Sequence, residues 1–207
     1  MNKIIKILIF NNVILNLGWG LAVPIFAIFI LQQIAVQNIA ETAIIIGISE
    51  LCFSLTRVIF QIPIGRYLDK NHGEKDDFWF MIIGNLLQAL IPIGFIFSHL
   101  AWHIYVLQLL HGFSAAMAFP SWSAMFTRHI DKNKEGLEWS FQSSFSNLAV
   151  GLAAAAGGFA VALFSVNLMF IFVSVFTFIS GIILLFIRKD VSPINEKVVR
   201  IPIQIHP

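Results

Sequence analysis

Two charged side chains, Glu50 and Arg57, lie within one long apolar stretch of the sequence. With Ser54 and Gln61 they follow spacings of four, three and four residues, which places them on one face of a helix. Ionisable groups inside an apolar helix cost about 2.5–3.5 kcal/mol on membrane-insertion scales and usually face a cavity or a partner. Glu50 and Arg57 would be two turns, about 10 Å, apart, too far for a direct ion pair. The face is expected either to line a path for a substrate or proton, or to form a polar seam against another helix or subunit.

A second polar face combines two amides with an aromatic side chain. Asn12, Asn16 and Trp19 follow the i, i+4, i+7 spacing of one helical face. Trp19 falls in the middle of its apolar stretch, away from the ends where Trp is common in membrane helices. This face is expected to form the wall of a cavity, or to make the interhelical hydrogen bonds that membrane bundles use.

Two other apolar stretches carry polar side chains. Gln108 and His111 share a face, and an imidazole can take part in a proton relay or simply hydrogen-bond within the bundle. A one-sided stripe of Ser140, Ser144, Asn147 and Gly151 is more typical of close helix packing. The candidate residues of a substrate cavity are Asn12, Asn16, Trp19, Glu50, Arg57, Gln108, His111 and Asn147.

No spacing typical of an enzyme is present in the sequence. It contains no His-Glu-x-x-His, no Gly-x-Ser-x-Gly and no phosphate-binding loop. His99 and His103 are four residues apart, but two metal ligands without a third do not predict a metal site. We expect neither catalysis nor a cofactor.

The composition places these faces in a lipid bilayer. Of 207 residues, 58% are hydrophobic and only 12% are charged, and the mean hydropathy is +0.84. A soluble domain has about a quarter charged residues, so the chain lacks the polar surface that a water-soluble globule needs. The net charge of +2 does not favour nucleic acid as a partner. A single cysteine, Cys52, excludes an intrachain disulfide.

Six apolar stretches are long enough to cross a hydrocarbon core of about 30 Å as helices. The sequence thus predicts an all-α membrane protein, with a six-span bundle over residues 1–190 and a polar cytoplasmic tail over 191–207. Short links around His99 and Val166 predict that spans three and four, and five and six, are antiparallel hairpins. The spans are Leu8–Leu31, Ala43–Ile64, Phe78–Phe97, Trp102–Phe126, Phe141–Phe164 and Leu168–Ile187.

The distribution of basic residues predicts the orientation of the bundle. Every Lys and Arg except Arg57 precedes the first span, follows the last, or falls in the second-to-third or fourth-to-fifth link. Basic residues accumulate on the cytoplasmic side of membrane proteins, so both termini are expected to be cytoplasmic.

The second-to-third link reads GRYLDKNHGEK, from Gly65 to Lys75, and resembles the signature loop of the major facilitator superfamily. Similar character extends over the whole chain, in LGWGLAVPIF (17–26), LQLLHGFSAAMAFP (107–120) and GLAAAAGGFAVALF (151–164), the last with the Gly pair of drug-exporting members. The chain departs from the family at Gln108, where an Arg is usual, and at Ala153–Ala154, where Gly-Pro is usual, which weakens the case for proton-driven export. The loop residues that match are Gly65, Asp69, Lys70, Gly73 and Lys75.

The resemblance implies one half of a major-facilitator fold, a 3+3 inverted repeat, with a substrate cavity and a cytoplasmic gating loop. Full-size members have two such halves, so the implied function is transport of a small solute or drug by alternating access in the inner membrane. The chain would work as a homodimer or with a complementary second six-helix half. A non-transporting membrane scaffold or sensor, and an inactive half-transporter fragment, remain as alternatives.

Overall fold

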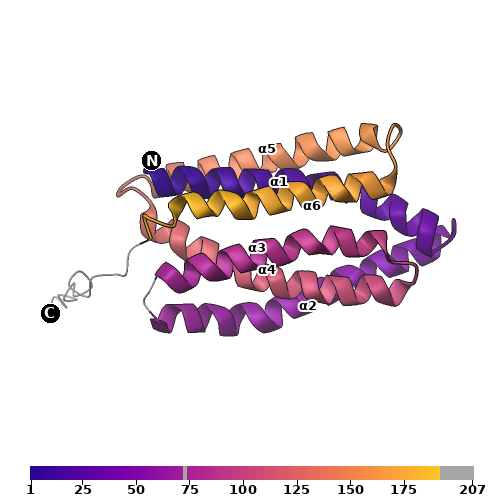
Figure 1. Cartoon of the computed structure of the whole chain (residues 1–207), viewed down its shortest axis with the longest axis horizontal. Helices are drawn as coiled ribbons and strands as arrows, with labels where there is room; N and C mark the ends of the chain where they lie inside the picture. The colour runs from indigo at the N-terminus through magenta and orange to yellow at the C-terminus, as the bar shows by residue number, and fades with distance from the viewer. Residues whose placement is uncertain (72–73, 192–207) are drawn as a thin grey trace.

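The structure, a computed structural model, describes residues 1–71 and 74–191, and all regular elements of these residues are helices (Figure 1). Gly73 and all of the predicted tail after Val191 lie outside the described residues. Six long helices form at the six predicted places. They are α1 (Lys3–Phe29), α2 (Ile39–Asn71), α3 (Glu74–Ile96), α4 (Ala101–His129), α5 (Glu135–Ala160) and α6 (Val166–Ile183), with a π-helical turn η1 (Ile30–Ile34) after α1 and a 3-10 turn η2 (Leu184–Ile187) after α6.

Helices α1 and α6 begin at polar capping residues ahead of their apolar stretches. The side chain of Asn2 accepts a hydrogen bond from the Ile5 backbone N–H (2.9 Å), so α1 begins five residues before the predicted span. The Ser165 hydroxyl accepts from the Leu168 N–H (3.3 Å) in the same way at the start of α6. For α1 and α6, apolar content sets which segment enters the bundle, whereas capping sets where the helix starts.

The helices pack in the order α5, α1, α6, α3, α4 and α2, with α5 and α2 at opposite edges of the bundle (Figure 1). Helices α3 and α4 form the predicted antiparallel hairpin. The expected hairpin of α5 and α6 is wrong: the two helices are joined by a short link, but α1 packs against both and separates them. A short link requires only that the helix ends be close, and the contact faces of the helices decide which neighbour each one packs against.

Two apolar clusters close the bundle near its two ends. The first combines Ile5 and Leu8 of α1 with Met81 of α3 and Trp122 and Phe126 of α4. The second lies toward the other end and is built from residues that include Ile25, Phe29, Phe95, Ile104 and Phe170. Between the two clusters α1, α3 and α4 carry polar residues, so the middle of the bundle is polar.

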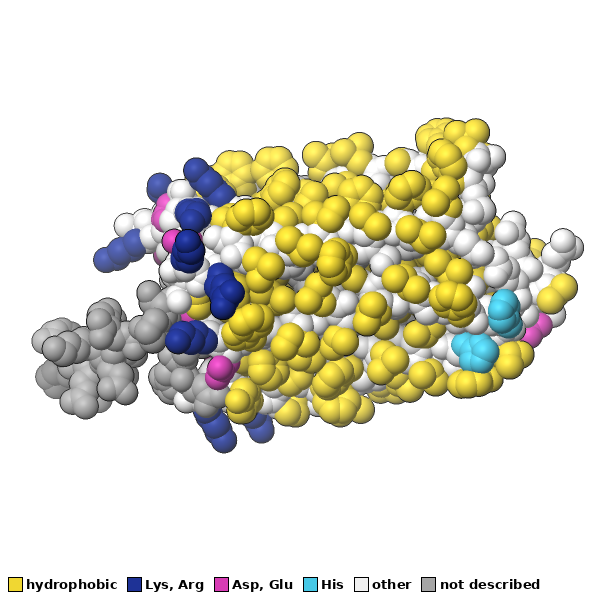
Figure 2. Space-filling model, in the orientation of Figure 1, with side chains coloured by type: hydrophobic (Ala, Val, Ile, Leu, Met, Phe, Trp, Pro, Cys, Tyr) yellow, Lys and Arg dark blue, Asp and Glu magenta, His cyan; other side chains and the backbone are white. Residues whose placement is uncertain are grey.

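On the face shown in Figure 2, the Lys and Arg side chains gather at one end of the bundle and apolar side chains cover its length. Lys3 at the start of α1 donates to the Asp190 carboxylate after η2 (2.7 Å), which brings the beginning of the chain and the end of α6 together. At the same end Arg128 of α4 pairs with the buried Asp77 of α3. Among the described residues, the basic side chains that the sequence assigns to one side of a membrane therefore share one end of the structure.

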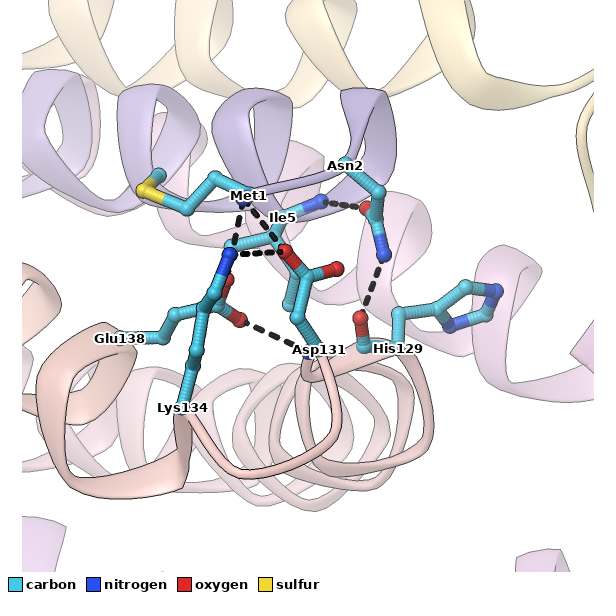
Figure 3. A network of polar contacts seen from close by, with 7 residues as sticks. All are labelled: Met1, Asn2, Ile5, His129, Asp131, Lys134 and Glu138. Carbon is cyan, nitrogen blue, oxygen red and sulfur yellow. Dashed lines mark hydrogen bonds and ion pairs between the residues drawn. The ribbon is translucent and has the colours of Figure 1, made fainter.

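The beginning of the chain is bound to the α4–α5 link (Figure 3). The Met1 ammonium donates to the Asp131 carboxylate (2.5 Å) and lies 3.4 Å from an oxygen of the fully buried Glu138. The Asn2 side-chain amide donates to the backbone carbonyl of His129 (2.5 Å). These contacts place the N-terminus against the ends of two helices from the middle of the chain.

Four helical stretches of the described residues are long and apolar enough to cross a membrane: Lys3–Ile34, Ile39–Lys70, Glu74–Ile96 and Val166–Ile187. Helices α4 and α5 also have the necessary length, 29 and 26 residues. They are more polar because they carry the amides, serines and histidine of the cavity described below. That all six helices cross the membrane stays a prediction.

Candidate functional site: a polar cavity between the helices

A cavity of about 570 Å³ lies between the two apolar clusters, with walls from α1 to α5. Met81 and Trp122, which belong to the cluster at the charged end, also line the cavity. A site of this volume is in the range of small-molecule pockets, about 300–1,000 Å³.

The oxygen of the Asn12 side chain is the centre of the hydrogen bonds between α1 and α5. It accepts from the side chains of Asn16 (2.7 Å), Gln142 (3.2 Å) and Ser146 (2.7 Å). Four residues separate Asn12 from Asn16 and Gln142 from Ser146, so each helix supplies two successive turns of one face. The network fixes the orientation of the amides on this wall.

Arg57 of α2 supplies a cation to the opposite wall. Its Nε–H donates to the side-chain oxygen of Gln61 one turn later (3.0 Å). Its guanidinium carbon lies 4.9 Å from the ring centroid of Phe119 and 6.0 Å from that of Phe53. Contacts with two rings stabilise the charge in an apolar environment.

Trp19 and His111 form a flat aromatic surface between α1 and α4. Their ring centroids are 4.0 Å apart and the rings are inclined by only 10°. The Nδ1 atom of His111 lies 3.1 Å from the Gln108 side-chain oxygen, and Phe53 of α2 contacts the imidazole with centroids 4.6 Å apart. The indole N–H of Trp19 is buried without a hydrogen-bond partner among the described residues.

The structure brings six of the eight predicted cavity residues to this cavity: Asn12, Asn16, Trp19, Arg57, His111 and Asn147. Gln108 lies behind the wall, where it is buried and contacts His111. Glu50 shares a helical face with Arg57 but is exposed on α2 and does not line the cavity, to which α2 contributes Phe53 and Arg57. That the six residues bind a substrate stays a prediction.

Several lining residues were missed by the sequence analysis. Asn85 and Gln88 project from α3, where two amides three residues apart in an apolar stretch could have indicated a polar face. On α5, the lining residues are Gln142, Ser143, Ser146 and Asn147, whereas Ser140 and Ser144 of the predicted stripe do not line the cavity. A stripe of small residues gave no means of choosing between adjacent faces of this helix.

The predicted gating loop lies at the charged end of the bundle. Gly65, Asp69 and Lys70 belong to the last turns of α2, and Lys75 to the first turn of α3. The carboxylate of Glu74, also in that first turn, lies 3.4 Å from the His129 imidazole of α4, next to the pair of Asp77 and Arg128. The acidic start of α3 is therefore held against the basic end of α4. A gating role for the loop stays a prediction.

Comparison with known proteins adds a family assignment. Residues 8–202 match the Major Facilitator Superfamily. The chain is 24% identical over 159 residues to the quinolone resistance protein NorA of Staphylococcus aureus, in strains Mu50, N315 and MW2. The match covers 77% of this chain but 38% of the relative, so the chain spans well under half the length of these curated relatives. With a family match over nearly its whole length and an all-helical bundle in the described residues, the chain belongs to the major facilitator superfamily of multi-pass membrane proteins.

Proposed function

We propose that this chain carries half of a transporter that moves a small solute or drug across the cell (inner) membrane by alternating access. All six helices would cross the bilayer with both termini in the cytoplasm. The observation that carries the proposal is the polar cavity at mid-length of an otherwise apolar bundle. Polar groups at that depth are expensive in lipid and are typical of a substrate pathway.

A second set of six helices is needed to complete the cavity in this proposal. Helices α2 and α5 stand at the two edges of the bundle and expose rows of large apolar side chains, such as Leu55 and Ile59 on α2 and Phe145 and Leu148 on α5. A second copy, related by a twofold axis along the membrane normal, would cover both edges and keep the orientation of both copies. A complementary six-helix half would cover them equally well.

The gating loop would contact this second half. Asp69 is exposed at the charged end, and so is Ser140 near the start of α5. The N-terminus of a helix attracts a carboxylate through its dipole. In a homodimer, Asp69 of one copy would therefore lie near the start of α5 in the other.

Transport is tested with the full chain in proteoliposomes and a fluorescent quinolone, the compound class in the name of the NorA relative. We expect wild-type protein to accelerate movement of the quinolone across the membrane. The variants Asn12→Ala and Gln88→Ala, which alter different walls of the cavity, should reduce the rate about three- to tenfold, on the order of one lost hydrogen bond. Asn167→Ala, at an exposed residue of α6, is the control. Equal rates in wild-type and empty liposomes would contradict transport of this solute class by a homodimer of the chain.

A further inference from the structure

The charge of the cavity wall is carried by one residue. Among the described residues that line it, Arg57 is the one Lys or Arg, and none is Asp or Glu. The remaining polar lining consists of amides, serines, Trp19 and His111. A solute in the cavity therefore meets a fixed positive charge with no acidic residue beside it from the part of the chain that the structure describes.

The guanidinium is oriented and remains available for a ligand. Gln61 and the rings of Phe53 and Phe119 hold it in place. Its Nε–H is used by Gln61, and an arginine has five N–H donors in a planar fork that matches a carboxylate. No carboxylate of the described residues forms an ion pair with it. An arginine at this depth needs an anion, because an unpaired charge in a poorly solvated site is expensive.

An aromatic surface lies next to this cation. Phe53 contacts both the Arg57 guanidinium (6.0 Å) and the imidazole of His111 (4.6 Å), and His111 stacks on Trp19 (4.0 Å). Arg57 and the Trp19–His111 pair are thus joined through one side chain on the wall of one cavity. A ligand with an anionic group attached to a flat ring would meet both features at once.

We propose that the cavity selects an aromatic monoanion, the simplest case being an aromatic carboxylate. The carboxylate binds the Nη–H groups of Arg57 and the ring packs against Phe53, His111 and Trp19. This inference deepens the proposed function by naming its substrate class. It can be tested by binding alone, without transport.

The test compares three probes of nearly equal shape on the purified full chain in nanodiscs, by isothermal titration calorimetry. They are 2-naphthoate, its neutral amide 2-naphthamide and the cationic 2-naphthylmethylamine. A charge-assisted hydrogen bond predicts that naphthoate binds about ten- to a hundred-fold more tightly than naphthamide, with the amine weakest. Equal affinities for naphthoate and naphthamide would overturn the proposal, as would tighter binding of the amine. Equal affinities are also expected if a carboxylate of a second copy already occupies Arg57.

Variants of Arg57 then assign the preference to this residue. Arg57→Gln should remove the preference for naphthoate while keeping the affinity for naphthamide, and Arg57→Lys should keep part of it because a point charge remains. Arg66→Gln removes an exposed cation near the end of the same helix and should leave the preference intact. An unchanged preference in Arg57→Gln would overturn the assignment. If that variant does not fold, the ranking of the three probes on wild-type protein and the affinities of Arg57→Lys still test the proposal.

The experiments distinguish a failure of the proposed transport function from a failure of the proposed preference for an aromatic monoanion. A naphthoate preference that depends on Arg57, in a protein that transports no quinolone by itself, would support the inference about the cavity and contradict transport by a homodimer. Quinolone transport by a protein that does not distinguish naphthoate from naphthamide would support transport and overturn the inference.

Discussion

At the scale of single residues, Asp131 connects three segments of the charged end. Its carboxylate accepts a hydrogen bond from the Met1 ammonium and lies 3.8 Å from the Lys134 ammonium, and its backbone N–H donates to Glu138 (3.2 Å). The hydrogen bond from the Met1 ammonium lowers the pKa of Asp131, and the two positive charges nearby act in the same direction. The ionised carboxylate is therefore favoured in the folded protein.

The depressed pKa of Asp131 predicts a loss of stability in acid. Between its folded pKa and the unfolded value of about 3.9, the unfolded chain binds more protons, so stability decreases as the pH falls through this window. In Asp131→Asn the contribution of the ionised carboxylate to stability is missing at every pH. We expect the melting temperature of wild type in detergent to exceed that of the variant at neutral pH and to approach it in acid. A difference that stays constant down to the lowest pH would contradict this origin.

At the scale of helices, α2 is positioned by its close contact with α4. A Cβ atom at Gly112 of α4 would lie 2.3 Å from the backbone carbonyl oxygen of Phe53, and a real side chain could not be accommodated without a shift of the α2 backbone. The absence of a side chain therefore permits the close packing of the two helices. Because Phe53 and Arg57 are one turn apart on α2, the same contact also sets the position of the cavity's cation.

Gly112→Ala should destabilise the protein by about 1–3 kcal/mol, the usual cost of overpacking, since backbone and not a flexible side chain must move. Gly47→Ala on α2 is the matched control, because a Cβ there meets no atom within 4 Å. Thermal unfolding in detergent should show a lower midpoint for Gly112→Ala and an unchanged or higher one for Gly47→Ala. Equal midpoints in the two variants would mean that α2 and α4 separate at little cost.

At the scale of the whole molecule, the described residues form a bundle with one charged end, an apolar surface and a polar middle. The charged end contains the start of the chain, the α4–α5 link and the end of α6. The opposite end contains the short α3–α4 link, with no Lys or Arg. This asymmetry supports the proposed orientation, with the charged end in the cytoplasm.

The orientation predicts which introduced cysteines react from outside the cell. In a Cys52→Ser background, His99→Cys in the α3–α4 link should react with a membrane-impermeant maleimide in intact spheroplasts. Lys132→Cys in the α4–α5 link should react only after the membrane is disrupted. Both wild-type residues are outside the helices, so helix packing does not limit access. The reverse pattern would place the charged end outside.

If the chain forms a homodimer, native mass spectrometry in mild detergent should give a mass of about 46 kDa, twice the 23.2 kDa of the chain. Asp69→Lys should reduce the dimer fraction, since a cation there would face the positive end of α5 in the partner. Asp76→Lys, also near the charged end, serves as a comparison for a charge reversal outside the proposed contact. A protein that is monomeric under all mild conditions would exclude the homodimer and favour a complementary six-helix half.

The sequence by itself determined the number and place of the helices and which links carry the charge. Long apolar runs can satisfy their backbone in lipid only as helices, and that signal is local. It also identified Asn12, Asn16 and Trp19 on the cavity wall that α1 contributes, because the period of a helix shows which residues share a face. These properties depend on neighbours within a few turns of the same chain segment.

The tertiary structure decided what each face meets and at what depth. Glu50 and Arg57 share a face, yet only Arg57 lines the cavity, because the wall that α2 contributes ends at Phe53, between the two. Asn85 and Gln88 line the cavity because the packing of α3 against α4 and α6 turns them toward it, and α1 separates α5 from α6 despite their short link. Helix packing depends on the fit of whole surfaces, such as Gly112 against the backbone of Phe53, and no local period of the sequence contains that information.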